Sequence, residues 1–277
     1  MKISANGFQL DLNTPVVMGI INRTSDSFYQ GGRHNLDDNL LQTCETMISH
    51  GAKIVDVGGV SSRPGANAVD EAEEIKRVVP TIKLLAENFP NTWFSVDTYR
   101  AHVAEMCVNA GARIINDISG GKLDSELLPT VARLNVPYIL MHMHGTPQTM
   151  QKEPLENNIT NTVLDFFKTK VEALHNIGIK QVILDPGYGF GKTTQANYTL
   201  LKNMEQLRVG GLPLLAGISR KSMINNVLNT TPDQALNGTT ALHTLALLNG
   251  ANILRVHDVR EAMECIRLVS FYKQATN

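Results

Sequence analysis

Residues 181–193, QVILDPGYGFGKT, place a carboxylate where a strand is expected to end. The apolar run 182–184 is typical of a strand buried on both faces, and Pro186 cannot donate to a β-ladder, so the strand should stop at Asp185. An aspartate before Pro-Gly can simply cap the turn that follows. It can also accept two parallel hydrogen bonds from the edge of a guanine-like or pterin-like ring, and the following glycines, aromatic residues and lysine are typical of a ligand pocket.

Two phosphate-binding motifs are excluded at this loop by their spacing. A P-loop needs four residues between its first glycine and the Gly-Lys-Ser/Thr triplet, whereas three residues separate Gly187 from Gly191. A dinucleotide-binding fingerprint needs GxGxxG, and this loop reads GxGxG. Asp185 is therefore the stronger indication of the ligand.

Apolar runs alternate with amphipathic segments along the whole chain. Strands are predicted at 16–21, 53–57, 93–96, 113–115, 137–143, 182–184, 214–218 and 253–256, and helices at 36–50, 70–87, from about 100, 125–134, 158–177, 235–248 and 259–274. About eight strand–helix units in a chain of this length predict an α/β fold, a (β/α)8 TIM barrel forming a single domain over residues 1–277. A doubly wound open sheet is the alternative, because barrel closure cannot be read from a sequence.

Polar residues stand at the ends of the predicted strands. In a barrel these ends face one rim, where the active site lies. Asp97, Asp185 and the amide Asn116 could read the donors of a flat heterocycle. Asn22 could supply a neutral oxygen to a Mg2+ ion that keeps its waters. Cations at the same rim could hold a phosphate or a comparable anion, and these are Arg63, Lys221, Arg255 and His257.

The composition is that of a globular protein with a substantial core: 277 residues, 43% hydrophobic, with a formal net charge of -1. Nothing in this balance indicates a nucleic-acid partner. No apolar stretch is long enough to cross a membrane and no signal peptide is expected, so we expect a cytoplasmic location. The three cysteines lack metal-ligand spacing and are expected to be buried, reduced thiols.

Eight segments carry a resemblance to a known family. They read MGIINRTSDSF, DVGGVSSRPG, SVDT, INDISGG, MHMHGTPQTM, LDPGYGFGKT, GISRKS and RVHDV. In order and spacing they resemble dihydropteroate synthases over nearly the whole chain. The resemblance implies that 6-hydroxymethyl-7,8-dihydropterin diphosphate condenses with p-aminobenzoate, giving 7,8-dihydropteroate and diphosphate in folate biosynthesis. It also implies the barrel fold, the use of Mg2+, and a homodimer built on the barrel's helices.

The resemblance further assigns residues to three neighbouring sites. It implies pterin binding by Asp97, Asn116, Asp185 and Lys221. It implies diphosphate binding by Asn22, Arg63, Arg255 and His257, with Asn22 also at the metal. It implies p-aminobenzoate binding by Phe28, Ser62, Arg63, Pro64, Phe190 and Ser219. Charge on the pterin and on the leaving diphosphate would be stabilised by the residues expected to act in catalysis, which are Asp185, Lys221, Arg255 and His257.

The sequence departs from the family pattern in the first two strand-following loops. The first has Arg23 and Ser25 where the pattern has Val and Pro, and the second has Val60 and Ser62 where it has Glu and Thr. The resemblance therefore supports pterin binding more firmly than normal handling of p-aminobenzoate. Two alternatives remain: a non-catalytic pterin-binding paralogue, and a methyltetrahydrofolate-type pterin methyltransferase, which gives no reason for so many cations at the rim.

Overall fold

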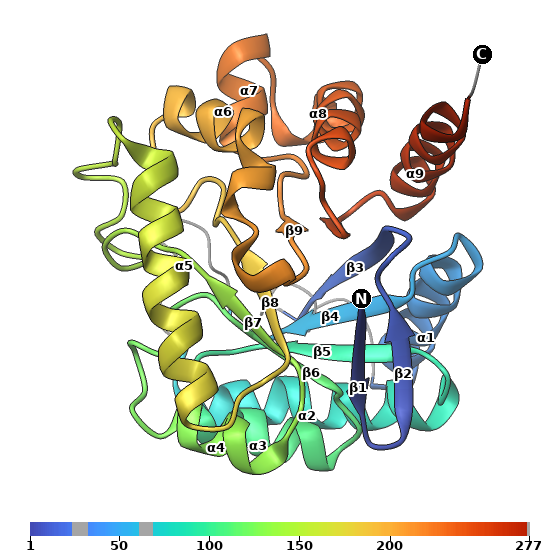
Figure 1. Ribbon diagram of the computed structural model, residues 1–277. Coiled ribbons are helices and arrows are strands. Elements are labelled where there is room, and N and C mark those ends of the chain that lie inside the picture. The colour runs from blue at the N-terminus through green and yellow to red at the C-terminus, as the bar shows by residue number, and fades with distance from the viewer. Residues whose placement is uncertain (24–32, 61–68, 276–277) are drawn as a thin grey trace.

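A computed structural model describes residues 1–23, 33–60 and 69–275, with the backbone alone for 33–36. In this part of the chain eight strands form one parallel sheet in the order β8-β7-β6-β5-β4-β3-β10-β9, with helices packed outside it (Figure 1). The strands are β3 (Val16–Asn22), β4 (Ile54–Gly58), β5 (Trp93–Asp97), β6 (Ile114–Asp117), β7 (Tyr138–Met141), β8 (Val182–Asp185), β9 (Leu215–Ala216) and β10 (Ile253–Val256).

The two edge strands of this sheet, β8 and β9, meet and nearly close a barrel. Leu184 in β8 forms a parallel bridge with Leu214, just before β9, and the Leu184 amide donates to the Pro213 carbonyl at 2.8 Å. The predicted (β/α)8 barrel is therefore confirmed. The doubly wound open sheet is wrong, because its edge strands would not meet.

The helices alternate with the strands as the sequence pattern predicts, apart from two that the pattern did not reveal. Those two, α6 (Thr194–Lys202) and α7 (Ser222–Leu228), follow β8 and β9. The other helices are α1 (Arg33–Ser49), α2 (Glu71–Asn88), α3 (Ala101–Asn109), α4 (Leu127–Leu134), α5 (Ile159–Asn176), α8 (Leu236–Leu248) and α9 (Val259–Gln274), and short 3-10 turns lie at Met204–Leu207, Val209–Gly211 and Pro232–Gln234. Within the described ranges, none of the helices is long and apolar enough to cross a membrane.

A hairpin of β1 (Lys2–Ala5) and β2 (Phe8–Asp11) covers the end of the barrel opposite the rim (Figure 1). It turns at Asn6-Gly7, both with positive φ, as the tightest hairpins require. The side chain of Gln181, just before β8, pairs with the amide and carbonyl of Ser4 at 2.6 and 2.8 Å. Asn252, just before β10, donates to the Leu12 carbonyl at 2.9 Å. The hairpin is therefore fastened to two strand starts.

The three cysteines, Cys44, Cys107 and Cys265, are free and buried, as the sequence predicts. Burial raises the pKa of the Cys44 thiol to about 12. These thiols act as core side chains rather than as nucleophiles.

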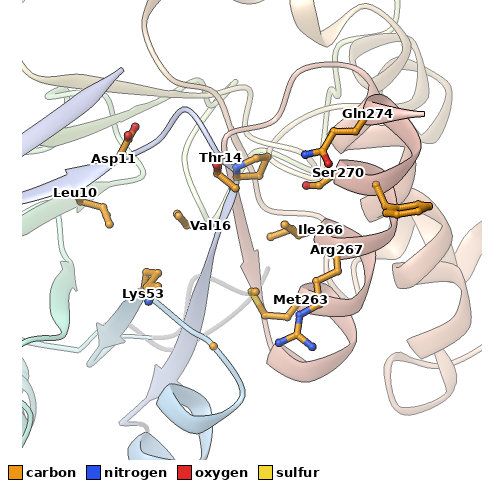
Figure 2. Close-up of a pocket in the computed structure, with 13 residues that line it drawn as sticks. Leu10, Asp11, Thr14, Val16, Lys53, Met263, Ile266, Arg267, Ser270 and Gln274 are labelled. Carbon is orange, nitrogen blue, oxygen red and sulfur yellow. The ribbon is translucent and has the colours of Figure 1, made fainter. Parts of the chain in front are cut away.

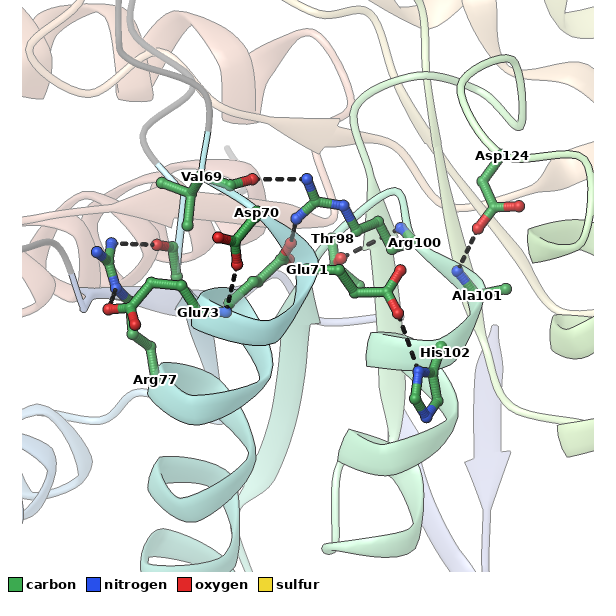
Figure 3. A network of polar contacts seen from close by, with 12 residues as sticks. Val69, Asp70, Glu71, Glu73, Arg77, Thr98, Arg100, Ala101, His102 and Asp124 are labelled. Carbon is green, nitrogen blue, oxygen red and sulfur yellow. Dashed lines mark hydrogen bonds and ion pairs between the residues drawn. The ribbon is translucent and has the colours of Figure 1, made fainter.

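Polar contacts join Gly59 and Val69, which flank residues 61–68, to the side chains of α2 and of the start of α3 (Figure 3). Arg77 donates to the Gly59 carbonyl at 3.0 Å, and Arg100 donates to the Val69 carbonyl at 2.6 Å. Arg100 also pairs with Glu74, whose side chain is only 1% exposed. The two arginines thus fix the chain on both sides of residues 61–68.

Replacing Arg100 with methionine is expected to destabilise the protein by about 3 kcal/mol, because it leaves a buried charge without its partner. Burial already raises the pKa of Glu74, and Arg100 lowers it, so the variant should raise it further. A raised carboxyl pKa means that stability falls as pH rises, so the loss should be larger at pH 8 than at pH 5. Urea unfolding at both pH values measures this loss. Arg133→Met, which removes an exposed pair with Glu105, is the control, and an equal loss in the two variants would contradict the assignment.

Candidate active site

The predicted site residues that the structure describes gather at the carboxyl ends of the strands. Asn22, Asp97 and Asp185 are the last residues of β3, β5 and β8, while Asn116 lies in β6 and Arg255 in β10. The loops after β8, β9 and β10 carry Phe190, Ser219, Lys221 and His257. Outside the described residues lie Ser25, Phe28, Ser62, Arg63 and Pro64.

A polar network crosses the barrel mouth and includes Asp56 in β4, which the sequence analysis did not single out. The Nε of Arg255 donates to Oδ2 of Asp56 at 2.7 Å, and its Nη2 donates to Oδ2 of Asp97 at 2.8 Å. The amide of Asn116 donates to the same oxygen of Asp56 at 3.0 Å. Asp56 is fully buried, so it orients two predicted ligand groups from below without reaching solvent itself.

Burial and neighbouring charges set the protonation of this network. Burial raises the pKa of Asp97 to about 7, Arg255 opposes the rise, and Asp56 adds to it. Burial alone would lower the pKa of Arg255, but Asp56 and Asp97 raise it above its usual range. Arg255 therefore stays charged, and it holds the pKa of Asp97 below the value that burial alone would give.

Asp185 and Lys221 line a second part of the mouth. Oδ1 of Asp185 accepts a hydrogen bond from the Gly187 amide at 2.8 Å, and Nζ of Lys221 donates to the Tyr188 carbonyl at 2.5 Å. A methyl group placed on Gly217 would lie 3.8 Å from that Nζ and 3.9 Å from Oδ2 of Asp185. The cation and the free carboxylate oxygen therefore border the same space.

Burial also perturbs these two groups. It raises the pKa of Asp185, while Lys221 and the Gly187 amide lower it. Burial lowers the pKa of Lys221 to about 8, and Asp185 opposes that fall. Perturbed groups with opposite charges at one cleft are typical of functional sites.

Phe190 offers an aromatic face beside this cation. Nζ of Lys221 lies 4.6 Å from the centre of the Phe190 ring, a cation–π contact. The ring also packs against a buried cluster formed by Ile118, Met141, Met143 and Met150. A flat ligand in front of Lys221 would therefore have an apolar neighbour.

Ser219 and His257 are paired with each other. The Ser219 hydroxyl lies 3.0 Å from Nδ1 of His257 and accepts from the His257 amide at 3.3 Å. Next to them, Arg220 donates two hydrogen bonds to Asp258, at 3.0 and 2.6 Å. The Ser219–His257 and Arg220–Asp258 contacts join the loops after β9 and β10. Ser219 therefore helps to hold the loop that carries His257, and its part in p-aminobenzoate binding stays a prediction.

Asn22 is exposed at the end of β3 and stands beside Asp97. A methyl group on Gly58, in the neighbouring strand, would lie 3.7 Å from Oδ1 of Asn22 and 3.5 Å from Cβ of Asp97. Within the described residues, no cluster of three His, Cys, Asp or Glu side chains could hold a metal ion. A single amide oxygen suits an ion that keeps its waters and also binds substrate oxygens.

A groove of about 620 Å³ lies elsewhere, between α9 and the start of β3 (Figure 2). Its walls are mainly apolar and include Val16, Met263 and Ile266, with Lys53 and Arg267 at its edge. Val16 and Lys53 stand at strand starts, so the groove opens away from the rim that carries the carboxylates and Lys221. Its size alone does not make it the active site.

Known proteins resemble this chain over nearly its whole length. Residues 18–257 match the family described as pterin binding enzyme. The dihydropteroate synthase of Escherichia coli K12 is 42% identical over 97% of this chain and 95% of its own length.

Solved structures agree with this match. The Yersinia pestis dihydropteroate synthase with a sulfonamide drug complex has a TM-score of 0.92 at 43% identity, covering 99% of this chain and 100% of that one. The Xanthomonas albilineans dihydropteroate synthase with 4-aminobenzoic acid has a TM-score of 0.91 at 36% identity, covering 99% of each. The fold, the order of the rim residues and these relatives agree, and this chain belongs to the dihydropteroate synthase family of pterin binding enzymes.

Proposed function

We propose that the barrel mouth condenses 6-hydroxymethyl-7,8-dihydropterin diphosphate with p-aminobenzoate, giving 7,8-dihydropteroate and diphosphate. The observation that carries this proposal is the shared space between Asp185 and Lys221, next to the network that joins Asn116 and Asp97 to Arg255. Donors and acceptors on two sides of one space suit a flat ring that has both kinds of group on its edge.

In this account Asp185 reads the amino edge of the pterin. Its Oδ1 already accepts from Gly187, which leaves Oδ2 facing the space in front of Gly217. The NH2 group of Asn116 donates to Asp56, which turns the side-chain oxygen of Asn116 toward the ring as an acceptor. Lys221 can donate to a ring acceptor, and its pKa of about 8 keeps most of it charged at neutral pH.

The reaction breaks the bond between the pterin methylene carbon and the diphosphate oxygen. Positive charge that develops on the pterin is stabilised by the carboxylates, and negative charge on the leaving diphosphate is stabilised by Arg255 and His257. The nitrogen of p-aminobenzoate forms the new bond to the methylene carbon and then loses a proton. This reaction needs no nucleophilic side chain, and the three buried cysteines have no part in it.

Asn22 is the described residue that fits a bound Mg2+ at this rim. It offers one amide oxygen, as expected for a hard cation that takes its remaining ligands from water and from substrate phosphates. When bound, the ion would neutralise charge on the diphosphate. The side chain of Asn22 would orient the ion, and Arg255 would hold the anion from the other side.

A coupled assay of diphosphate release tests the proposed function. Release should require both p-aminobenzoate and the pterin diphosphate, and mass spectrometry should identify dihydropteroate as the product. Pterin binding without turnover would instead indicate the non-catalytic paralogue. Methyl transfer from methyltetrahydrofolate would indicate the methyltransferase.

The homodimer expected for this family would use the outer face of α8 and α9. Large apolar side chains are exposed there, namely Leu245, Leu248, Leu268, Phe271 and Tyr272, and Figure 1 shows the two helices next to each other. Exposed apolar patches of this kind mark interaction surfaces. Sedimentation of the parent and of Phe271→Glu tests this: the parent should have the mass of a dimer and the variant that of a monomer. Equal masses would contradict the interface.

We place the reaction in the cytoplasm, where the three free thiols stay reduced.

A further inference from the structure

Lys192 is a buried cation that none of the roles above uses. It is 4% exposed, although lysine is seldom buried without a partner. Its Nζ donates to three backbone carbonyls: that of Gly187 at 2.8 Å and those of His142 and Phe190 at 3.1 Å each. All three ammonium hydrogens are therefore satisfied by the main chain, and Lys192 needs no ligand of its own.

These carbonyls belong to two loops that follow neighbouring strands, β7 and β8 (Figure 1). Gly187 has φ +67°, and a Cβ added there would lie 2.0 Å from the His142 carbonyl oxygen. Gly191 has φ +68°, and its Cβ would lie 2.3 Å from the His144 carbonyl oxygen. The loops therefore pack backbone against backbone, and the lysine ammonium joins carbonyls from both.

The loop after β8 presents the groups that the proposed pterin site needs. The Gly187 amide donates to Asp185 while its carbonyl accepts from Lys192. The next carbonyl, that of Tyr188, accepts from Lys221, and the ring of Phe190 lies below the same cation. Without the ammonium, the carbonyls of Gly187 and Phe190 would lose their donor, and these two residues bound the stretch that makes the contacts to Asp185 and Lys221.

The charge of Lys192 is costly to keep in this place. Burial lowers the pKa of Lys192 to about 7, Asp185 opposes the fall, and Lys221 adds to it. An apolar side chain here would leave three carbonyls without this donor, which costs stability, so stability and pterin binding have to be measured separately.

We propose that Lys192 is a positioning residue: by joining the loops after β7 and β8 it fixes the Gly187–Phe190 segment, and so holds Asp185 and Lys221 in place for the pterin ring. The proposal deepens the proposed function and rests on it for the identity of the ligand. All three ammonium hydrogens of Lys192 go to the main chain, so it acts through the loop rather than by a contact of its own with the pterin. Because the segment includes Phe190, which the family resemblance assigns to p-aminobenzoate, the KM for p-aminobenzoate should rise as well.

The test compares Lys192→Met, which keeps the unbranched chain up to the position of Cε without its donors, with Lys180→Met as the matched control. Lys180 also donates to a backbone carbonyl, that of His175 at 2.8 Å, but it is exposed and lies before β8, at the opposite end of the strand. Calorimetry with 6-hydroxymethylpterin measures affinity, thermal unfolding measures stability, and steady-state kinetics give the KM for p-aminobenzoate. Hydrogen exchange of the Gly187 amide, followed in ligand-free protein, reports on the loop without any substrate.

For Lys192→Met we expect pterin affinity to fall at least about tenfold, Gly187 exchange to accelerate by a similar factor, and the p-aminobenzoate KM to rise. Lys180→Met should match the parent in every measurement. If Lys192→Met does not fold, Lys192→Gln replaces it under the same criteria, because its shorter side chain has two amide hydrogens for three carbonyls and leaves at least one of them without a donor. A folded variant with unchanged pterin affinity and unchanged Gly187 exchange would overturn the proposal, whatever its unfolding temperature. A parent that lacks turnover would refute the proposed function alone, because the exchange measurement needs no substrate.

Discussion

Asp185→Asn is expected to weaken pterin binding by about 10- to 150-fold, the loss that corresponds to one charge-assisted hydrogen bond of 1.5–3 kcal/mol. The Gly187 amide donates to Oδ1 at 2.8 Å, so the asparagine oxygen would turn toward Gly187. Its NH2 group would then face the edge of the pterin, where the ring also donates. Two donors would meet, and both would stay unpaired.

Calorimetric titration with 6-hydroxymethylpterin measures this loss directly. Asp124→Asn is the matched control, because Asp124 also accepts a backbone amide, that of Ala101 at 2.7 Å, but at the first residue of α3 rather than in the Asp185–Gly187 turn. The control should bind like the parent. Affinity of Asp185→Asn within about twofold of the parent would remove Asp185 from the pterin site.

Arg255→Ala is expected to reduce turnover by about 10²-fold or more, by analogy with the loss of an oxyanion donor. The guanidinium holds Asp56 and Asp97 at 2.7 and 2.8 Å, so its removal also leaves two carboxylates facing each other. Because Arg255 lowers the pKa of Asp97, that pKa should rise further above its value of about 7. Much of Asp97 would then be protonated at neutral pH.

Turnover and binding must be measured separately to interpret this variant. If Arg255 stabilises the leaving diphosphate, turnover should fall more than affinity for the pterin alcohol, which has no diphosphate. His257→Ala should show the same pattern. Arg260→Ala serves as the control, since Arg260 is exposed on α9 and pairs with Glu264. Equal losses in binding and turnover would indicate that Arg255 and His257 hold the mouth together instead.

The sequence predicted the barrel and most of the rim because both rest on local patterns. Buried parallel strands appear as apolar runs, and the polar residue that ends each run necessarily faces the rim, as Asp97 and Asp185 do. The N-terminal hairpin had a local signal too, since Asn6-Gly7 is a strong turn pair between short polar-apolar alternations. That signal was missed.

Other features depend on distances that no local pattern contains. Asp56 lies one residue before the end of the apolar part of β4, yet its partners Asn116 and Arg255 are 60 and 199 residues away. The helix α6 was also missed, although the alternation of strand and helix calls for one after β8 and Thr193 accepts from the Ala196 amide as its N-cap. Lys192 was noticed as a cation, but its three carbonyl partners depend on two loops packing together.

The most direct test of the central claim is a crystal structure of this protein with 6-hydroxymethylpterin bound. We expect the amino edge of the ring within hydrogen-bond distance of Asp185, with Asn116 and Lys221 on the same ring and Phe190 beside it. A pterin bound in the groove beneath α9, or one in the mouth whose ring makes no contact with Asp185, would contradict the proposed site.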